Sequence, residues 1–194
     1  MYYHSETYNG VLFLLREPHT DKKDQNLPVE EIINKSNEWV CKMLNGSSYN
    51  SDWKRTDKAM ATLYRKRLGQ ILKIIGINPK ELPNIGYDNL YKPGGGATKS
   101  PEYEKTLKEY TRSAFKQLLE KLGYQTRYIF TRCDTYNQLK CMLPVTEEAE
   151  GLQYKTFNRT CKQFLYRDAL GNDVRIFAMY HPSSRTTLKE NQHL

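Results

Sequence analysis

The sequence has no apolar run long enough to cross a membrane and no pattern of a secretory leader. Its longest uninterrupted apolar run is Val11 to Leu15, whereas a membrane span needs roughly 20 such residues. The first ten residues are polar and include His4 and Glu6, unlike the charged-then-apolar layout of a signal peptide. We therefore expect a cytoplasmic protein that does not enter membranes.

Paired cysteines and cofactor-binding glycine motifs are also missing. No cysteine belongs to a C-x-x-C pair or lies at metal-binding spacing from a histidine, which favours reduced thiols over a metal or cluster site. There is no Walker loop, and the triglycine Gly94-Gly95-Gly96 lacks the strand-turn-helix context of a dinucleotide site. We expect no cofactor and no metal. The four cysteines are Cys41, Cys133, Cys141 and Cys161.

The composition indicates a globular protein with an anionic partner. With 194 residues, 38% of them hydrophobic, the chain can form one domain that spans residues 1–194. Lys and Arg number 30 and Asp and Glu 22, so the net charge is 30 − 22 = +8. This surplus favours nucleic acid as a partner, and an acidic membrane surface second. The 15 tyrosines can stack on bases or fill half-buried positions.

The first half of the chain alternates strand-like and helical patterns. The apolar run at 10–15 predicts a strand that is buried on both faces. Helical spacing and capping residues predict helices at 28–44 and 56–75. A short strand-like segment at 84–91 then leads into a basic loop at 92–100.

The second half predicts another helix and three more strand-like runs. Ser100-Pro101-Glu102 is a good helix start, and the apolar stripe of that helix continues to Leu122 before Gly123. Runs at 127–131, 156–167 and 174–180 are strand-like. Gly171-Asn172 predicts a hairpin turn between the last two runs.

This order predicts an α/β fold, a three-layer α/β/α sandwich around a central, mainly parallel four-stranded sheet. In such sheets the functional site lies beyond the carboxyl ends of the strands. Three polar segments leave predicted strands there: Arg16 to His19, Asp88-Asn89 and His181 to Ser183. We expect a monomer with its site at this edge.

These three segments resemble motifs of the uracil-DNA glycosylase superfamily. Leu15-Arg16-Glu17-Pro18-His19 resembles the family's first motif, which follows an apolar strand and ends in an acidic or small residue and proline. Gly86 to Lys92 resembles the strand that ends in the asparagine that reads the base. Tyr180-His181-Pro182-Ser183-Ser184-Arg185 closely resembles the late His-Pro-Ser loop. The resemblance spans nearly the whole chain in order.

The resemblance implies a DNA-repair glycosylase that acts on uracil or another deaminated base flipped out of DNA. Asn89 would read the base edge, with Pro18 and His19 also lining the base site. His181 would stabilise charge on the departing base, and Glu17 would orient water. The residues that would contact DNA are Ser183, Ser184, Arg185, Lys92 and Lys99, with Arg185 as a wedge in the gap left by the base.

The sequence departs from the family at several positions, which leaves open a divergent member with an altered substrate. Two alternatives to a glycosylase also remain. The opening glycine of the first motif is absent, Glu17 is one methylene longer than the usual aspartate, and no base-stacking Phe follows at the family's spacing. The family's early cysteine pair for an iron–sulfur cluster is also absent. One alternative is a catalytically inactive nucleic-acid-binding module on the same fold. The other is an unrelated α/β enzyme with a small anionic substrate.

Aromatic and basic residues outside these motifs allow both a structural and a binding interpretation. Tyr103 and Tyr110 fit the apolar stripe of their helix, and Trp53 lies in a polar loop. Basic residues on the second predicted helix form either a solvated face or a phosphate contact. These residues are Lys58, Arg65, Lys66, Arg67 and Lys73.

Overall fold

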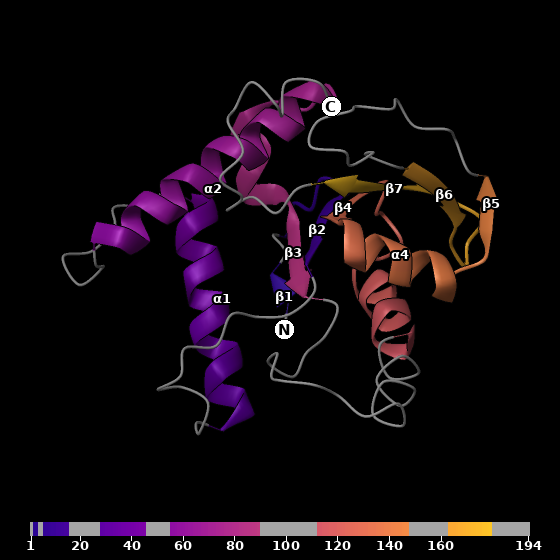
Figure 1. Cartoon of the computed structure of the whole chain (residues 1–194), viewed down its shortest axis with the longest axis horizontal. Helices are drawn as coiled ribbons and strands as arrows, with labels where there is room; N and C mark the ends of the chain where they lie inside the picture. Colours follow the sequence, from indigo (N-terminus) through magenta and orange to yellow (C-terminus); the bar gives the residue numbers. More distant parts are fainter. Residues whose placement is uncertain are drawn as a thin grey trace.

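A seven-stranded mixed sheet with four parallel central strands forms the centre of the molecule (Figure 1). This computed structural model describes residues 2–3, 6–15, 28–45, 55–89, 112–147 and 163–179. The strand order is β1-β3-β2-β4-β7-β6-β5. The strands are β1 (Tyr2–Tyr3), β2 (Val11–Leu15), β3 (Gly86–Asn89), β4 (Tyr128–Arg132), β5 (Val145–Glu147), β6 (Gln163–Arg167) and β7 (Asp173–Met179).

The predicted α/β class is confirmed, but the sheet is wider than the predicted four strands. Strands β3, β2, β4 and β7 run parallel to one another. Strand β1 pairs antiparallel with β3 at one side, and β6 and β5 extend the other side antiparallel. The five strand-like runs of the sequence include the four parallel strands and the hairpin strand β6. The sequence missed β1 and β5, which have only two and three residues.

Strand β2 is buried on both faces, as its unbroken apolar sequence predicts. Val11 and Phe13 belong to one hydrophobic cluster, whereas Leu12 and Leu14 belong to the other. All four side chains are at most 1% exposed. Because successive strand residues point to opposite faces, these two clusters lie on opposite faces of the sheet.

Different helices cover the two faces of the sheet. Helix α1 (Val29–Asn45) and helix α2 (Arg55–Ile74) contribute apolar side chains to the cluster of Phe13. Helix α4 (Cys133–Met142) and the helical residues 112–121 contribute to the cluster of Leu14. In Figure 1, α1 and α2 lie to the left of the sheet and α4 lies at its lower right.

Helix α2 corrects one prediction about its basic side. Its bounds match the predicted 56–75 within one residue. Arg67, however, is only 7% exposed, so it is not part of a solvated basic face. Its position explains this burial, because Tyr64, Leu68 and Ile71 lie three, one and four residues away and are buried in the core. The exposed basic residues of α2 include Lys66 and Lys73.

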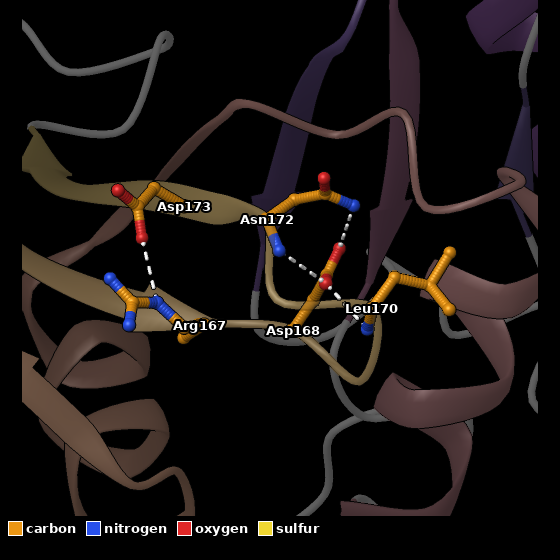
Figure 2. Close-up of polar contacts among 5 residues, drawn as sticks. All are labelled: Arg167, Asp168, Leu170, Asn172 and Asp173. Atoms are coloured by element: carbon orange, nitrogen blue, oxygen red, sulfur yellow. Dashed lines mark hydrogen bonds and ion pairs between the residues drawn. The ribbon is translucent and has the colours of Figure 1, made fainter.

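Strands β6 and β7 form the predicted hairpin, and Asp168 organises its turn (Figure 2). The Oδ1 atom of Asp168 accepts hydrogen bonds from the backbone N–H groups of Leu170 at 2.8 Å and Asn172 at 2.9 Å. Its Oδ2 atom accepts from Asn172 Nδ2 at 3.1 Å. Gly171 takes a φ of 83°, a left-handed conformation that favours glycine. The predicted Gly171-Asn172 turn is therefore confirmed.

Candidate functional site at the carboxyl edge

The parallel strands place the ends of the three motif strands at one edge of the sheet. Leu15 at the end of β2 is paired with Asn89 at the end of β3. On the other side of β2, Leu14 is paired with Thr131 of β4, and Arg132 of β4 with Met179 at the end of β7. The segments that begin at Arg16 and Tyr180 therefore leave from the same edge.

The spacing of strands sets how far apart these segments start. Strands β3 and β2 are neighbours, whereas β4 separates β2 from β7. Neighbouring strands are about 4.8 Å apart, so the ends of β3 and β7 are about 14 Å apart. A common site for the three motifs must therefore lie over the ends of β2 and β4.

Asn89 is the only predicted site residue whose backbone is described, as the last residue of β3. The others lie outside the described residues, so their proposed roles stay predictions. They are Glu17, Pro18, His19, Lys92, Lys99, His181, Ser183, Ser184 and Arg185. Trp53, Tyr103, Tyr110 and the helix start at Ser100 also lie outside the described residues.

A topological switch point lies between β2 and β4. The chain leaves β2 toward α1 on one face of the sheet, whereas it leaves β4 directly into α4 on the other face. Where neighbouring strands send their connections to opposite faces, a crevice opens beyond their carboxyl ends, and open α/β sheets bind ligands there. This is the same place that the spacing of the motif strands indicates.

The start of α4 places the positive end of a helix dipole at this switch point. Arg132 is the N-cap of α4 and makes no side-chain cap hydrogen bond. The N–H groups of a first helical turn have no acceptor within the helix, and the helix dipole adds positive potential. Next to the cap, the Thr131 side chain is fully buried, and its Oγ1 has no hydrogen-bond partner in the part of the chain that the structure describes. An anionic group fits such a helix start.

The sequence placed Asp88 at this edge but did not predict that it is buried. Asp88 is 1% exposed and is paired in register with Leu14 on β2 and with Tyr2 on β1. Strand alternation puts Asp88 on the face of α4, because its neighbour Tyr87 packs with α1 and α2. Carboxylates are rarely this buried unless they are paired. The sequence signal for Asp88 was its position between Tyr87 and Asn89, the predicted base-reading residue.

Other groups in the described ranges add no metal centre. No group of three or more His, Cys, Asp or Glu side chains in these ranges could hold a metal ion. Cys41, Cys133 and Cys141 are not joined in disulfides, and Cys161 lies outside the described residues. Among the described helices, none is long and apolar enough to cross a membrane.

Comparison with known proteins leaves the family open. No family model, no curated protein and no solved structure matches this chain. The assignment of function therefore rests on the chain's own residues and geometry.

Proposed function

We propose that this protein is a DNA-repair glycosylase and a divergent member of the uracil-DNA glycosylase superfamily. It hydrolyses the N-glycosidic bond of uracil or of another deaminated base that is flipped out of DNA. The observation that carries the proposal is the shared edge of the parallel sheet, from which the segments of Glu17, Asn89 and His181 all start. The formal charge of +8 suits a polyanionic substrate.

The proposed mechanism divides the work among three side chains. Asn89 offers one acceptor and two donors to the edge of the flipped base. His181 donates a hydrogen bond to the base oxygen on which negative charge develops as the glycosidic bond breaks. Glu17 orients the attacking water and balances positive charge on the sugar. Pro18 and His19 line the base pocket beside Glu17.

DNA is held in this proposal by backbone contacts around the same edge. Lys92, Lys99, Ser183 and Ser184 bind phosphates, and Arg185 fills the gap left by the base. The start of α4 supplies a further place for a phosphate at the switch point. We further propose a monomeric, cytoplasmic protein of a single domain, residues 1–194, folded as a three-layer α/β/α sandwich without a cofactor.

The test is release of a base from defined oligonucleotides. Duplexes that carry uracil, hypoxanthine, xanthine or mispaired thymine are incubated with the protein, and abasic sites are revealed by alkaline cleavage. We expect release from at least one of them. We expect His181→Ala to lower the rate about 100- to 1000-fold, as the loss of an oxyanion donor does, without loss of DNA affinity.

A matched charge control separates catalysis from general electrostatics. Glu17→Gln and Glu38→Gln change the net charge equally, but Glu38 lies exposed on α1 and pairs with Lys42. Only Glu17→Gln should abolish base release. If the wild-type protein binds DNA but releases none of these bases, the glycosylase proposal is wrong and the inactive nucleic-acid-binding module is favoured. Binding that hardly weakens with salt would favour a small anionic substrate instead.

A further inference from the structure

The two faces of the sheet differ where β7 and β6 lie. On the face of α4, Phe164, Ile176 and Val174 are at most 1% exposed. On the opposite face, Leu165 and Phe177 are only half-buried, and Arg167 and Arg175 are exposed. One face of this part of the sheet is thus buried in the core, whereas the other face is partly exposed.

The position of α1 and α2 explains this difference. Their apolar side chains pack on β2 and β3, and their cluster reaches β4 and β7 only at Phe130 and Met179. Tyr128 and Phe177 lie at the margin of this cluster, and no residue of β6 belongs to it. Figure 1 shows α1 and α2 at one end of the sheet and β6 near the other.

A row of stacked aromatic rings runs across this face and ends at its open part. The rings of Phe13 and Phe130 are 5.3 Å apart, and those of Phe130 and Phe177 are 5.1 Å apart with an interplanar angle of 11°. Phe130 stacks on one face of the Phe177 ring, so a further ring in this row would lie on the side of β6, the next strand of the sheet. Gln163 is the β6 residue in register with Phe177.

Guanidinium groups flank the end of this row. Arg175 lies two residues before Phe177 on the same face of β7, and its register neighbours are Tyr128 and Leu165 rather than acids. Arg167 of β6 is in register with Asp173 of β7, the next residue pair on this face. Its Nε atom lies 3.1 Å from Asp173 Oδ1 (Figure 2). Both partners of that ion pair are more than half exposed, so it is weak and Arg167 can exchange to another anion.

We propose that this face, defined by Tyr128, Phe177, Arg175 and Arg167, binds single-stranded nucleic acid. An unpaired base continues the aromatic row on the outer face of Phe177, and Arg175 and Arg167 contact the adjoining phosphates. Aromatic rings on a sheet face select unpaired bases, because a duplex buries its bases in its own stack. The arginines favour a polyanion over an apolar protein segment. Tyr128, Arg175 and Arg167 lie toward the amino ends of β4 and β7, whereas Phe177 lies two residues before the end of β7. The proposal does not depend on the glycosylase proposal.

The test measures binding of an undamaged oligothymidylate of about 15 nucleotides and of the corresponding duplex by fluorescence anisotropy. We expect the single strand to bind more tightly. Phe177→Leu keeps an apolar side chain but removes the ring, and should weaken single-strand binding about 5- to 10-fold. Phe177→Tyr keeps the ring and should bind as the wild type does. Thermal unfolding of both variants checks that the fold is retained.

The charge contribution has its own matched control. Arg175→Gln and Lys116→Gln remove one positive charge each, but exposed Lys116 lies on the opposite side of the sheet. Only Arg175→Gln should reduce the slope of log affinity against log salt, by about 0.7 for one lost phosphate contact. Equal effects of the two variants, or unchanged binding by Phe177→Leu, would overturn the proposal. A dimer that dissociates on Phe177→Leu without a change in binding would also overturn it.

These outcomes are distinguishable from failure of the glycosylase proposal. The oligothymidylate contains no deaminated base, so its binding reports on the sheet face without any base release.

Discussion

Several tyrosine hydroxyls are buried, so the pKa values of these side chains differ between the folded and the unfolded protein. Tyr87 is 7% exposed within the cluster of α1 and α2. Burial, with a smaller contribution from nearby Tyr64, raises the pKa of Tyr87 well above its usual value. Burial also raises the pKa of Tyr8, although the hydrogen bond with Thr126 at 3.0 Å acts in the opposite direction. Both side chains therefore stay neutral in the folded protein at moderately alkaline pH.

We predict that stability falls above about pH 10 because of this burial. In the unfolded chain Tyr87 loses its proton near pH 10, whereas the folded protein retains it. The stabilising contribution is thus fully present below the unfolded pKa and is lost as the pH rises toward the folded pKa. The free energy of unfolding should fall by up to about 1.4 kcal/mol per pH unit for this one group. Urea unfolding between about pH 8 and 11 measures it.

Tyr87→Phe is the matched variant for this prediction. It removes the titrating hydroxyl and leaves the ring, so the alkaline decrease in unfolding free energy should become shallower by one proton. Tyr8 contributes its own proton in both proteins. An unchanged pH slope in Tyr87→Phe would show that Tyr87 does not ionise on unfolding and would contradict the prediction.

At the level of elements, Gly10 joins the start of β2 to β4. Its carbonyl oxygen accepts hydrogen bonds from the backbone N–H groups of Arg127 at 2.8 Å and Tyr128 at 3.1 Å. Its φ is +83°, and a Cβ atom placed on it would lie 2.9 Å from the Gln125 carbonyl oxygen. A side chain at Gly10 would therefore be both strained and in conflict with backbone.

We predict that Gly10→Ala destabilises the protein more than Gly171→Ala. Gly171 has the same φ of +83°, but a Cβ atom there would meet nothing within 4 Å. Gly171→Ala should cost only the left-handed conformation, about 1–2 kcal/mol. Gly10→Ala adds the steric conflict with Gln125 and should cost about 2–4 kcal/mol. Urea denaturation compares the two variants, and equal losses would contradict this account.

The elements that the sequence predicted are those with local signals. Helix α1 follows Pro28 and ends before Gly46, and its bounds agree with the prediction within about one residue. Helix α4 was missed because it follows β4 without a loop, and because its N-cap is Arg132 rather than a residue with a capping oxygen. The burial of Arg67 could have been predicted from its helical spacing to core residues, but its charge suggested a solvated face.

For the whole molecule, the sequence predicted which segments form the strands that carry the motifs, but not how these strands pair. The end of β3 at Asn89 and of β7 at Met179 follow from local patterns. The order that puts β2 between β3 and β4 depends on pairings between residues far apart in sequence, for which local periodicity gives no signal. The switch point and the burial of Asp88 follow from that order.

The two hydrophobic clusters share one sheet, and this predicts that they unfold together. Phe13 and Leu14 are consecutive residues of β2 but belong to different clusters. Loss of β2 pairing therefore exposes both clusters at once. We expect a single transition in urea, with coincident curves from far-ultraviolet and near-ultraviolet circular dichroism.

Leu68→Ala and Leu139→Ala test this coupling from opposite sides of the sheet. Both side chains are fully buried, one in each cluster, so each variant should lose about 2–5 kcal/mol of unfolding free energy. Both should shift the same transition to lower urea and leave its steepness unchanged. Ile74→Ala, at a side chain that is 45% exposed, should change stability much less. A second transition in either core variant, seen by one spectroscopic probe and not the other, would show that the two clusters unfold separately.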